Sequence, residues 1–201
     1  MIDTAHGISD LPPRAVRGTV ILISGARQIG KTTVLCHVRE TALQTGYSVG
    51  GFLSVARFAA DETGAEAKTG IDLMDAATGA RLPLATIGGD GPVQTGHYTF
   101  NPAALEAGLV YAQAGQGADV FFVDELGPLE LKRGAGWVAV LGMIRARQFG
   151  VALMTMRPEL LDLARERMHL PPAAPLITIT AANREQIAHQ LAAWVKGAIA
   201  K

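Results

Sequence analysis

One stretch of ten residues, SGARQIGKTT at Ser24–Thr33, constrains the fold of this chain more than any other. It follows the apolar run TVILI and precedes the helical pattern VLCHVRETALQ. Gly25–Thr32 matches G-x-x-x-x-G-K-[ST], which between a strand and a helix is typical of a phosphate-binding loop. The glycines let backbone N–H groups point at an anion, and the helix dipole adds to the attraction. A turn that only caps a helix would need no lysine there.

This loop predicts a site for a nucleoside triphosphate. We expect Lys31 to place its charge at the β- and γ-phosphates and Thr32 to offer its hydroxyl to Mg²⁺. Arg27 is expected to reach over the nucleotide or its γ-phosphate, where an arginine accelerates phosphoryl transfer about 10³–10⁵-fold; a solvated loop side chain is the alternative. The predicted nucleotide-binding residues are Gly25, Ala26, Arg27, Gln28, Ile29, Gly30, Lys31, Thr32, Thr33 and Arg184.

The segment ADVFFVDELG supplies the acids that such a loop requires. An apolar run ends in Asp124 and Glu125 at the carboxyl end of a predicted strand. Asp124 is therefore expected to hold the Mg²⁺ shell, and Glu125 to orient or deprotonate an attacking water. The alternative for Glu125 is a solvated residue at a strand end. An acid directly after the metal-binding aspartate also predicts that one strand lies between the lysine-bearing and acid-bearing strands.

Short β-branched runs alternate with helical patterns, which predicts an α/β fold of one domain over residues 1–201 with a mainly parallel central sheet. The predicted strands are Thr19–Ser24, Val49–Ala56, Val120–Asp124, Val151–Thr155 and Leu176–Thr180, and the predicted helices include Lys31–Gln44 and Arg184–Ile199. Between residues 64 and 100, the runs IDLMDAATGARLPLATI and GHYTF predict a small β-hairpin insertion that projects from the sheet, with a flexible loop at Gly88–Gly91.

Composition argues against several classes of function. The 201 residues carry 18 basic and 18 acidic side chains without a basic run, which disfavours nucleic acid or an acidic membrane as the partner. Cys36 is the only cysteine and is expected to be a small buried hydrophobe, and the five histidines lack metal-ligand spacing. The start of the chain lacks the pattern of a signal peptide, and no apolar run could span a bilayer, so we expect a cytoplasmic protein.

Further segments give the chain a resemblance to the THEP-type nucleoside-triphosphatases, whose animal member is called cancer-related nucleoside-triphosphatase. Besides the loop, they are GGFLSVAR, IDLMDAATGARLPLA, TGHYTFNPAALE, VDELGPLEL and TITAANREQI, and the match runs from about 18 to 194. The resemblance implies a three-layer RecA-like P-loop fold, Mg²⁺ as cofactor, and slow hydrolysis of the β–γ bond of ATP, GTP and related nucleotides. The chain departs from the family pattern at Arg27 and Gln28, before Arg57, where an acid is missing, and at His97.

Other polar residues have two interpretations each. Thr155 and Arg157 end a predicted strand at the sheet edge where ligands of α/β folds bind, and Thr155 is either a sensor of the γ-phosphate or an ordinary strand-end residue. Asn183 is expected to cap the last helix, and Arg184 to border the nucleobase. Glu130 is expected to support the site from behind or to lie at the surface.

Two other functions stay open at this point. The chain could be a kinase that transfers phosphate to a small molecule or nucleotide held by the β-insertion. It could also be a nucleotide-dependent switch or accessory protein that serves an unknown protein partner in cofactor or metal delivery. In both cases the same loop would bind the nucleotide.

Overall fold

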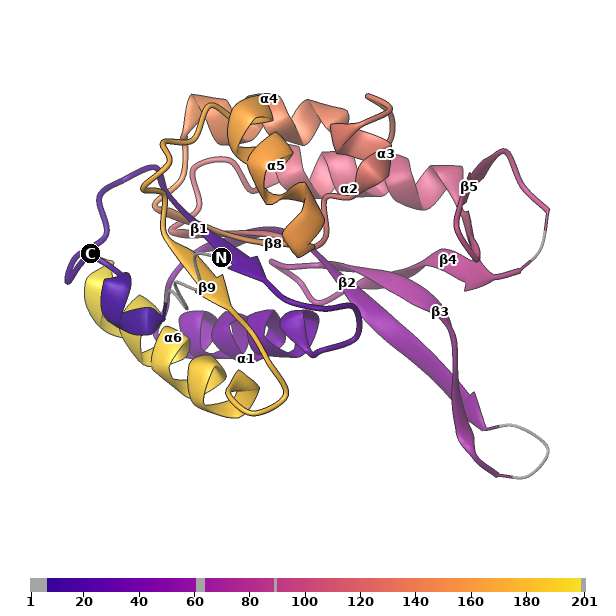
Figure 1. Cartoon of the computed structure of the whole chain (residues 1–201), viewed down its shortest axis with the longest axis horizontal. Helices are drawn as coiled ribbons and strands as arrows, with labels where there is room; N and C mark the ends of the chain where they lie inside the picture. The colour runs from indigo at the N-terminus through magenta and orange to yellow at the C-terminus, as the bar shows by residue number, and fades with distance from the viewer. Residues whose placement is uncertain (1–6, 61–63, 89, 200–201) are drawn as a thin grey trace.

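The computed structural model describes residues 7–60, 64–88 and 90–199, and within these ranges it shows a nine-stranded sheet with helices on both faces (Figure 1). The strands lie in the order β5-β6-β4-β3-β2-β7-β8-β1-β9. They are β1 (Thr19–Ser24), β2 (Val49–Ala60), β3 (Glu66–Asp75), β4 (Arg81–Ile87), β5 (Val93–Thr95), β6 (Tyr98–Phe100), β7 (Val120–Val123), β8 (Val151–Met156) and β9 (Leu176–Thr178). The helices are α1 (Lys31–Gln44), α2 (Pro102–Ala114), α3 (Pro128–Leu131), α4 (Val138–Ala146), α5 (Leu161–Arg167) and α6 (Arg184–Ala198), with short 3-10 helices η1 (Ile8–Asp10) and η2 (Pro158–Leu160).

The strands β2, β7, β8, β1 and β9 pair in parallel, and we call them the parallel half of the sheet. β8 lies between β1, which leads into the phosphate-binding loop, and β7, which ends before Asp124. The prediction of one intervening strand is thus confirmed. β1 is buried on both faces, which explains its unbroken apolar sequence TVILI.

The strands β3, β4, β6 and β5 form the antiparallel half, and they correct two predictions. The sheet is mixed rather than mainly parallel, because strands joined by short connections run antiparallel. The strands within 64–100 are also not a small separate hairpin. β2 runs on past the predicted end at Ala56 to Ala60 and pairs with β3 along this length, so the later strands widen the same sheet. The far end of β2 and β3 projects from the body in Figure 1.

Two apolar cores cover the two faces of the sheet. One packs α2, α4 and α5 against the sheet through residues such as Ala104, Val140, Ile144 and Ala164. The other packs α1 and α6 against the opposite face through Val34, Val38, Ile187, Leu191 and Val195. Figure 1 shows the resulting three layers, which agree with the predicted arrangement.

The predicted helix bounds hold well where a cap signal exists. α1 spans the predicted Lys31–Gln44 and is followed by Gly46 in the left-handed region, which stops it. α6 ends at Ala198, one residue before the predicted end. Position 89, inside the predicted loop at Gly88–Gly91, lies outside the described residues. Positions 1–6, on which the expectation about the start of the chain depends, lie outside them as well.

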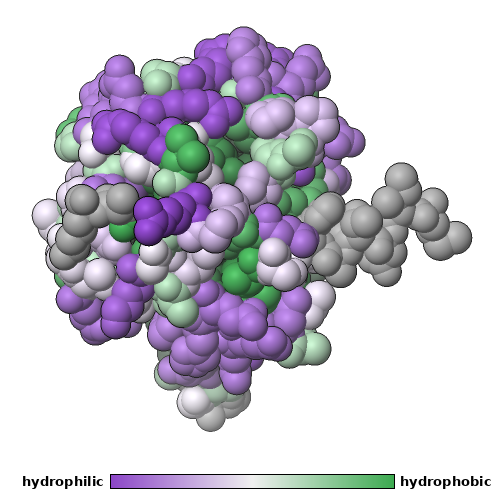
Figure 2. Space-filling model, turned by 90° about the vertical axis from the view of Figure 1, so that its left-hand side faces the viewer, coloured by the Kyte–Doolittle hydropathy of each residue, from purple (hydrophilic) through white to green (hydrophobic). Residues whose placement is uncertain are grey.

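The surface is polar on the side where α6 and η1 lie (Figures 1 and 2). Figure 2 shows hydrophobic residues there as small areas among hydrophilic ones. Over the described ranges, none of the helices combines the length and apolar character needed to cross a bilayer.

Candidate active site

The phosphate-binding loop owes its shape to three backbone positions. Gly30 has φ +105° and Gln28 has φ +59°, both in the left-handed region. A Cβ at Gly25 would lie 2.5 Å from the carbonyl oxygen of Ile179, so only glycine fits between the loop and the segment after β9. A left-handed residue other than glycine costs about 1–3 kcal/mol, and such strain is common at functional sites.

Lys31 opens α1 with its ammonium turned into the loop. Its Nζ donates hydrogen bonds to the carbonyl oxygens of Gly25 and Ala26, each at 2.9 Å. Burial lowers the pKa of Lys31, while the negative charges of Glu125 and Asp124 oppose that shift and the positive charge of Arg157 adds to it. The ammonium therefore lies within electrostatic range of both acids and of Arg157, at the mouth of an anion-binding loop.

Asp124 is the centre of the polar cluster below the loop. Its side chain is buried, at 1% exposure, and Oδ2 accepts hydrogen bonds from the hydroxyl of Thr32 at 2.7 Å and from the backbone N–H of Ser54 at 3.0 Å. The hydroxyl of Thr155 donates to Oδ1. Burial raises the pKa of Asp124, and these three hydrogen bonds act against the rise. The hydroxyl of Thr32 after the loop thus contacts the carboxylate of Asp124 after β7, as the sequence motifs predicted.

Glu125 follows with a strained backbone and two partners. Its φ is +62°, and its backbone N–H donates to the hydroxyl of Thr155 at 2.8 Å. Arg157 donates from Nε to Oε1 of Glu125 at 3.2 Å, and its Nη1 lies 3.9 Å from a carboxylate oxygen of Glu159. Glu125 is therefore held above Asp124 at the carboxyl edge of the sheet rather than free in solvent.

The remaining predicted nucleotide-binding residues surround this cluster. Ala26, Arg27, Gln28 and Thr33 are exposed, and Ile29, Gly30 and Thr32 are half-buried. Arg184 comes against the loop, because its Cδ would lie 3.3 Å from a Cβ built at Gly30. The structure thus brings the first turn of α6 to the loop and leaves the side chain of Arg27 exposed.

Asn183 corrects one expectation. It precedes α6, yet its side chain makes no capping hydrogen bond to that helix. Instead Oδ1 accepts from the backbone N–H of Thr180, and Nδ2 donates to the carbonyl of Thr178. The residue closes the turn that leads from β9 to Arg184, because its amide satisfies backbone groups on both sides of the turn.

Glu130 supports the site from behind, one of its two predicted roles. It is buried and accepts from the backbone N–H groups of Gly127 at 2.9 Å and Trp137 at 3.2 Å. Burial raises the pKa of Glu130, against the effect of these hydrogen bonds. The carboxylate thereby ties both ends of the segment after Glu125 together.

Other candidates from the sequence lie apart from this cluster or serve packing. Arg57 forms an ion pair with Asp72 at 2.9 Å across β2 and β3. His97 lines a hollow of about 350 Å³ beside Tyr98 in the antiparallel half. Cys36 is half-buried rather than fully buried, and burial raises the pKa of its thiol to about 11.

Sequence reasoning missed two contributors. Ser54 was not predicted, although its backbone N–H holds Asp124; a backbone contact leaves no trace in residue type. Arg157 was placed at the correct edge of the sheet but not paired with Glu125. Its spacing of two from Thr155 was the available signal, because residues two apart on an extended chain share a face.

The sequence also matches known proteins. Residues 20–192 match the family described as NTPase. The nucleoside-triphosphatase THEP1 of Methanopyrus kandleri is 31% identical over 175 residues, covering 85% of this chain and 92% of that protein. THEP1 of Archaeoglobus fulgidus is 28% identical over 179 residues, covering 88% of this chain and 99% of that protein.

Two solved structures share the fold. The solution structure of a human cancer-related nucleoside triphosphatase superposes with a TM-score of 0.63 at 20% identity, covering 88% of this chain and 97% of that one. The crystal structure of THEP1 from Aquifex aeolicus gives a TM-score of 0.60 at 22% identity, covering 86% and 96%. At these identities the two structures bear on the fold alone.

Proposed function

We infer the reaction from the premise that this chain belongs to the NTPase family, the family of the THEP1 nucleoside-triphosphatases. The resemblance in its motifs is thereby confirmed, and the chain is an enzyme that hydrolyses nucleoside triphosphates. We propose in addition that the reaction depends on Mg²⁺, breaks the β–γ bond, and takes ATP or GTP as substrate. The observation that carries this proposal is the contact between Thr32, next to the phosphate-binding lysine, and the buried carboxylate of Asp124.

The residues at this contact suit a magnesium ion. Thr32 and Asp124 offer oxygen atoms only, the ligands that Mg²⁺ prefers. Within the described ranges, no three histidine, cysteine or acidic side chains gather to hold a metal by themselves. An ion held by Thr32 and Asp124 would therefore share its remaining positions with phosphate oxygens and water, as magnesium commonly does. When bound, the ion would withdraw negative charge from the phosphates.

The chain itself would bind the triphosphate and activate water. Backbone N–H groups of the loop and the Lys31 ammonium hold the β- and γ-phosphates. Glu125 takes a proton from water as the water oxygen bonds to the γ-phosphorus and the bond to the β–γ bridging oxygen breaks. The products are a nucleoside diphosphate and inorganic phosphate, and the proton passes to solvent. Arg27 would reach over the phosphates from the surface, and Arg184 would border the base.

Phosphate release by the purified protein tests this function directly. With ATP or GTP and Mg²⁺ we expect slow release that falls at least about 100-fold in Lys31→Ala and in Glu125→Gln, and that stops when EDTA removes the metal. Lys31→Ala should also weaken nucleotide binding, whereas Glu125→Gln should retain it. Equal rates for the wild type and Lys31→Ala would refute the proposal.

Product masses separate hydrolysis from its two alternatives. A hydrolase yields only the diphosphate and free phosphate. A phosphorylated small acceptor in a screen would identify a kinase, for which the hollow beside His97 is the first place to look. Tight nucleotide binding without turnover until a protein partner is added would identify a switch or accessory protein.

A further inference from the structure

The ion pair between Arg157 and Glu125 stands out because it joins the proposed water-activating carboxylate to a cation. Arg157 follows β8 with an extended backbone, φ −83° and ψ 150°, so it shares the face of Thr155. Thr155 contacts Asp124, and one step outward Arg157 contacts Glu125. The pairs Thr155–Asp124 and Arg157–Glu125 lie next to each other at the same edge of the sheet, on the side of α1 and the phosphate-binding loop.

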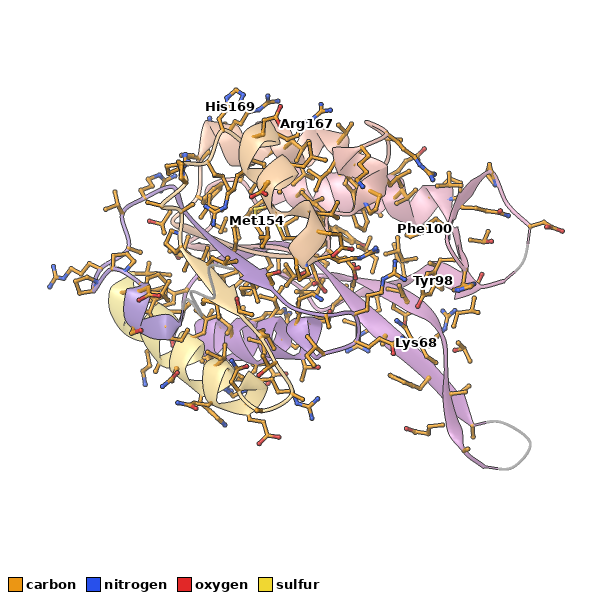
Figure 3. All side chains as sticks on the ribbon, viewed as in Figure 1. Lys68, Tyr98, Phe100, Met154, Arg167 and His169 are labelled. Atoms are coloured by element: carbon orange, nitrogen blue, oxygen red, sulfur yellow. The ribbon has the colours of Figure 1, made fainter. Side chains whose placement is uncertain are left out.

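The position of Arg157 fits contact with the end of a triphosphate. Its side chain is 15% exposed, against 38% for Glu125, so most of the Arg157 side chain is shielded from solvent. In Figure 3, Met154 on the same strand lies in the body of the sheet, whereas Arg167 and His169 lie at the outer rim. The contact of Arg157 with Glu125 places its guanidinium at the cluster that also holds Asp124 and Thr155.

A bound triphosphate would change the partner that Arg157 prefers. Glu125 offers one carboxylate, whereas a terminal phosphate offers three strong acceptor oxygens and up to about two negative charges. Arginine binds such groups with two parallel hydrogen bonds. Glu159, whose Oε1 lies 3.9 Å from Nη1 of Arg157 and whose side chain is 62% exposed, competes only weakly for the guanidinium.

We propose that Arg157 senses the γ-phosphate: its guanidinium holds the Glu125 carboxylate in the nucleotide-free site and transfers to the γ-phosphate of a bound triphosphate, which leaves that carboxylate free to turn toward the attacking water. The inference rests on the proposed function, since it assigns a role in the same reaction. A diphosphate lacks the group that attracts the guanidinium, so Arg157 stays on Glu125 when product is bound. The base is therefore released only when substrate is present.

The deciding measurement is the ratio of two affinities. Calorimetry with Mg²⁺ compares a non-hydrolysable ATP analogue with ADP, for the wild type, Arg157→Ala, Arg157→Lys and a control, Arg167→Ala at the exposed end of α5. We expect Arg157→Ala to bind the analogue about 10–100-fold more weakly, the worth of a charge-assisted hydrogen bond, while its affinity for ADP changes less than about threefold. The affinity of Arg157→Lys for the analogue should lie between those of the wild type and Arg157→Ala, because lysine keeps the positive charge but lacks the paired N–H donors of the guanidinium. Arg167→Ala should match the wild type in both affinities.

Turnover supplies a second readout. In Arg157→Ala, kcat should fall at least about 100-fold, whereas a residue that only restrains Glu125 would give unchanged or higher kcat when removed. An unchanged ratio of the two affinities in Arg157→Ala would overturn the inference even if the wild type hydrolyses ATP. Failure of the wild type to hydrolyse any triphosphate would instead refute the proposed function, and the affinity ratio would still decide the role of Arg157. Circular dichroism checks folding, and Arg157→Gln replaces the alanine variant if that variant unfolds.

Discussion

The parallel and antiparallel halves of the sheet treat polar groups in opposite ways. The buried polar and charged residues Ser24, Lys31, Asp124, Glu130 and Thr155 all lie in the parallel half or in the segments that leave its strands. In the antiparallel half and at the outer end of β2, large apolar side chains are exposed instead, among them Phe58, Leu82 and Ile87. Burying polar groups costs free energy unless each finds a partner. Polar burial is therefore concentrated where the chemistry needs it.

The partners of Asp124, Thr155 and Glu130 show how the cost is met, whereas the hydroxyl of Ser24 has no hydrogen-bond partner among the described residues. Thr155 satisfies Asp124 and the backbone of Glu125, and Glu130 satisfies two backbone N–H groups. By contrast, the ion pair of Arg57 with Asp72 keeps both side chains partly in water, at 31% and 19% exposure. Substitutions should therefore be costly in one half and mild in the other.

Of the substitutions that test this contrast, the largest loss of stability is expected from Thr155→Val, which keeps the shape and removes the hydroxyl. Asp124 Oδ1 and the N–H of Glu125 would each lose a partner, at about 1–3 kcal/mol per buried group. We expect a lower free energy of unfolding in urea titrations and roughly 10–100-fold slower phosphate release. Thr155→Ser, which restores the hydroxyl, should recover most of both. A valine variant as stable and active as the wild type would show that substitutions at buried polar residues of the parallel half are not more costly than those in the antiparallel half.

An intermediate effect is expected in the pH dependence of stability. Burial raises the folded pKa of Glu130 above its unfolded value of about 4.5, so its contribution is complete below that pH and is lost as pH rises through the folded pKa. Each unit of difference corresponds to about 1.4 kcal/mol. Glu130→Gln should flatten the fall in unfolding free energy above pH 4.5, although Asp124 shifts in the same direction and leaves some slope.

The matched control for this measurement is Asp72→Asn in the antiparallel half. Its ion pair is partly exposed, so its removal should leave the slope above pH 4.5 as in the wild type. If Asp72→Asn flattened the curve and Glu130→Gln did not, the buried carboxylates of the parallel half would not be the source of the pH dependence.

The smallest effect is expected from Phe58→Thr at the outer end of β2. Phe58 is 55% exposed, and threonine keeps a strong preference for strands. The free energy of unfolding should change by no more than about 0.5 kcal/mol, with nucleotide turnover unchanged. A large loss of activity would show that the projecting end of β2 and β3 takes part in the reaction.

The parallel half was largely predictable because its signals are local. The loop motif placed Lys31 at the start of α1, and the acid pair after an apolar run placed Asp124 at the end of a strand. The contact between Thr32 and Asp124 then followed from the rule that parallel strands present their carboxyl ends at one edge.

The rest depended on pairings that no short pattern records. β2 reaches Ala60 because β3 pairs with it around a bulge at Arg57 and Phe58, and an exposed pair of alanines gives no strand signal by itself. The hold of Ser54 on Asp124 is a backbone contact. Arg157 pairs with Glu125 instead of extending into solvent because of its side-chain conformation, and sequence spacing does not determine that conformation.

The place of β8 inside the sheet bears on the order in which the molecule opens. β8 pairs with β1 along its whole length and with β7 from Val151 to Met154, whereas β5 and β9, three residues each, form the two rims. Amide protons of the rims should exchange with solvent through local fraying, and those of β8 only when the whole sheet separates. The strand that carries Thr155 is thus expected to stay paired during local unfolding of the sheet edges. The proposed reaction site would therefore keep Thr155 in place while β5 and β9 fray.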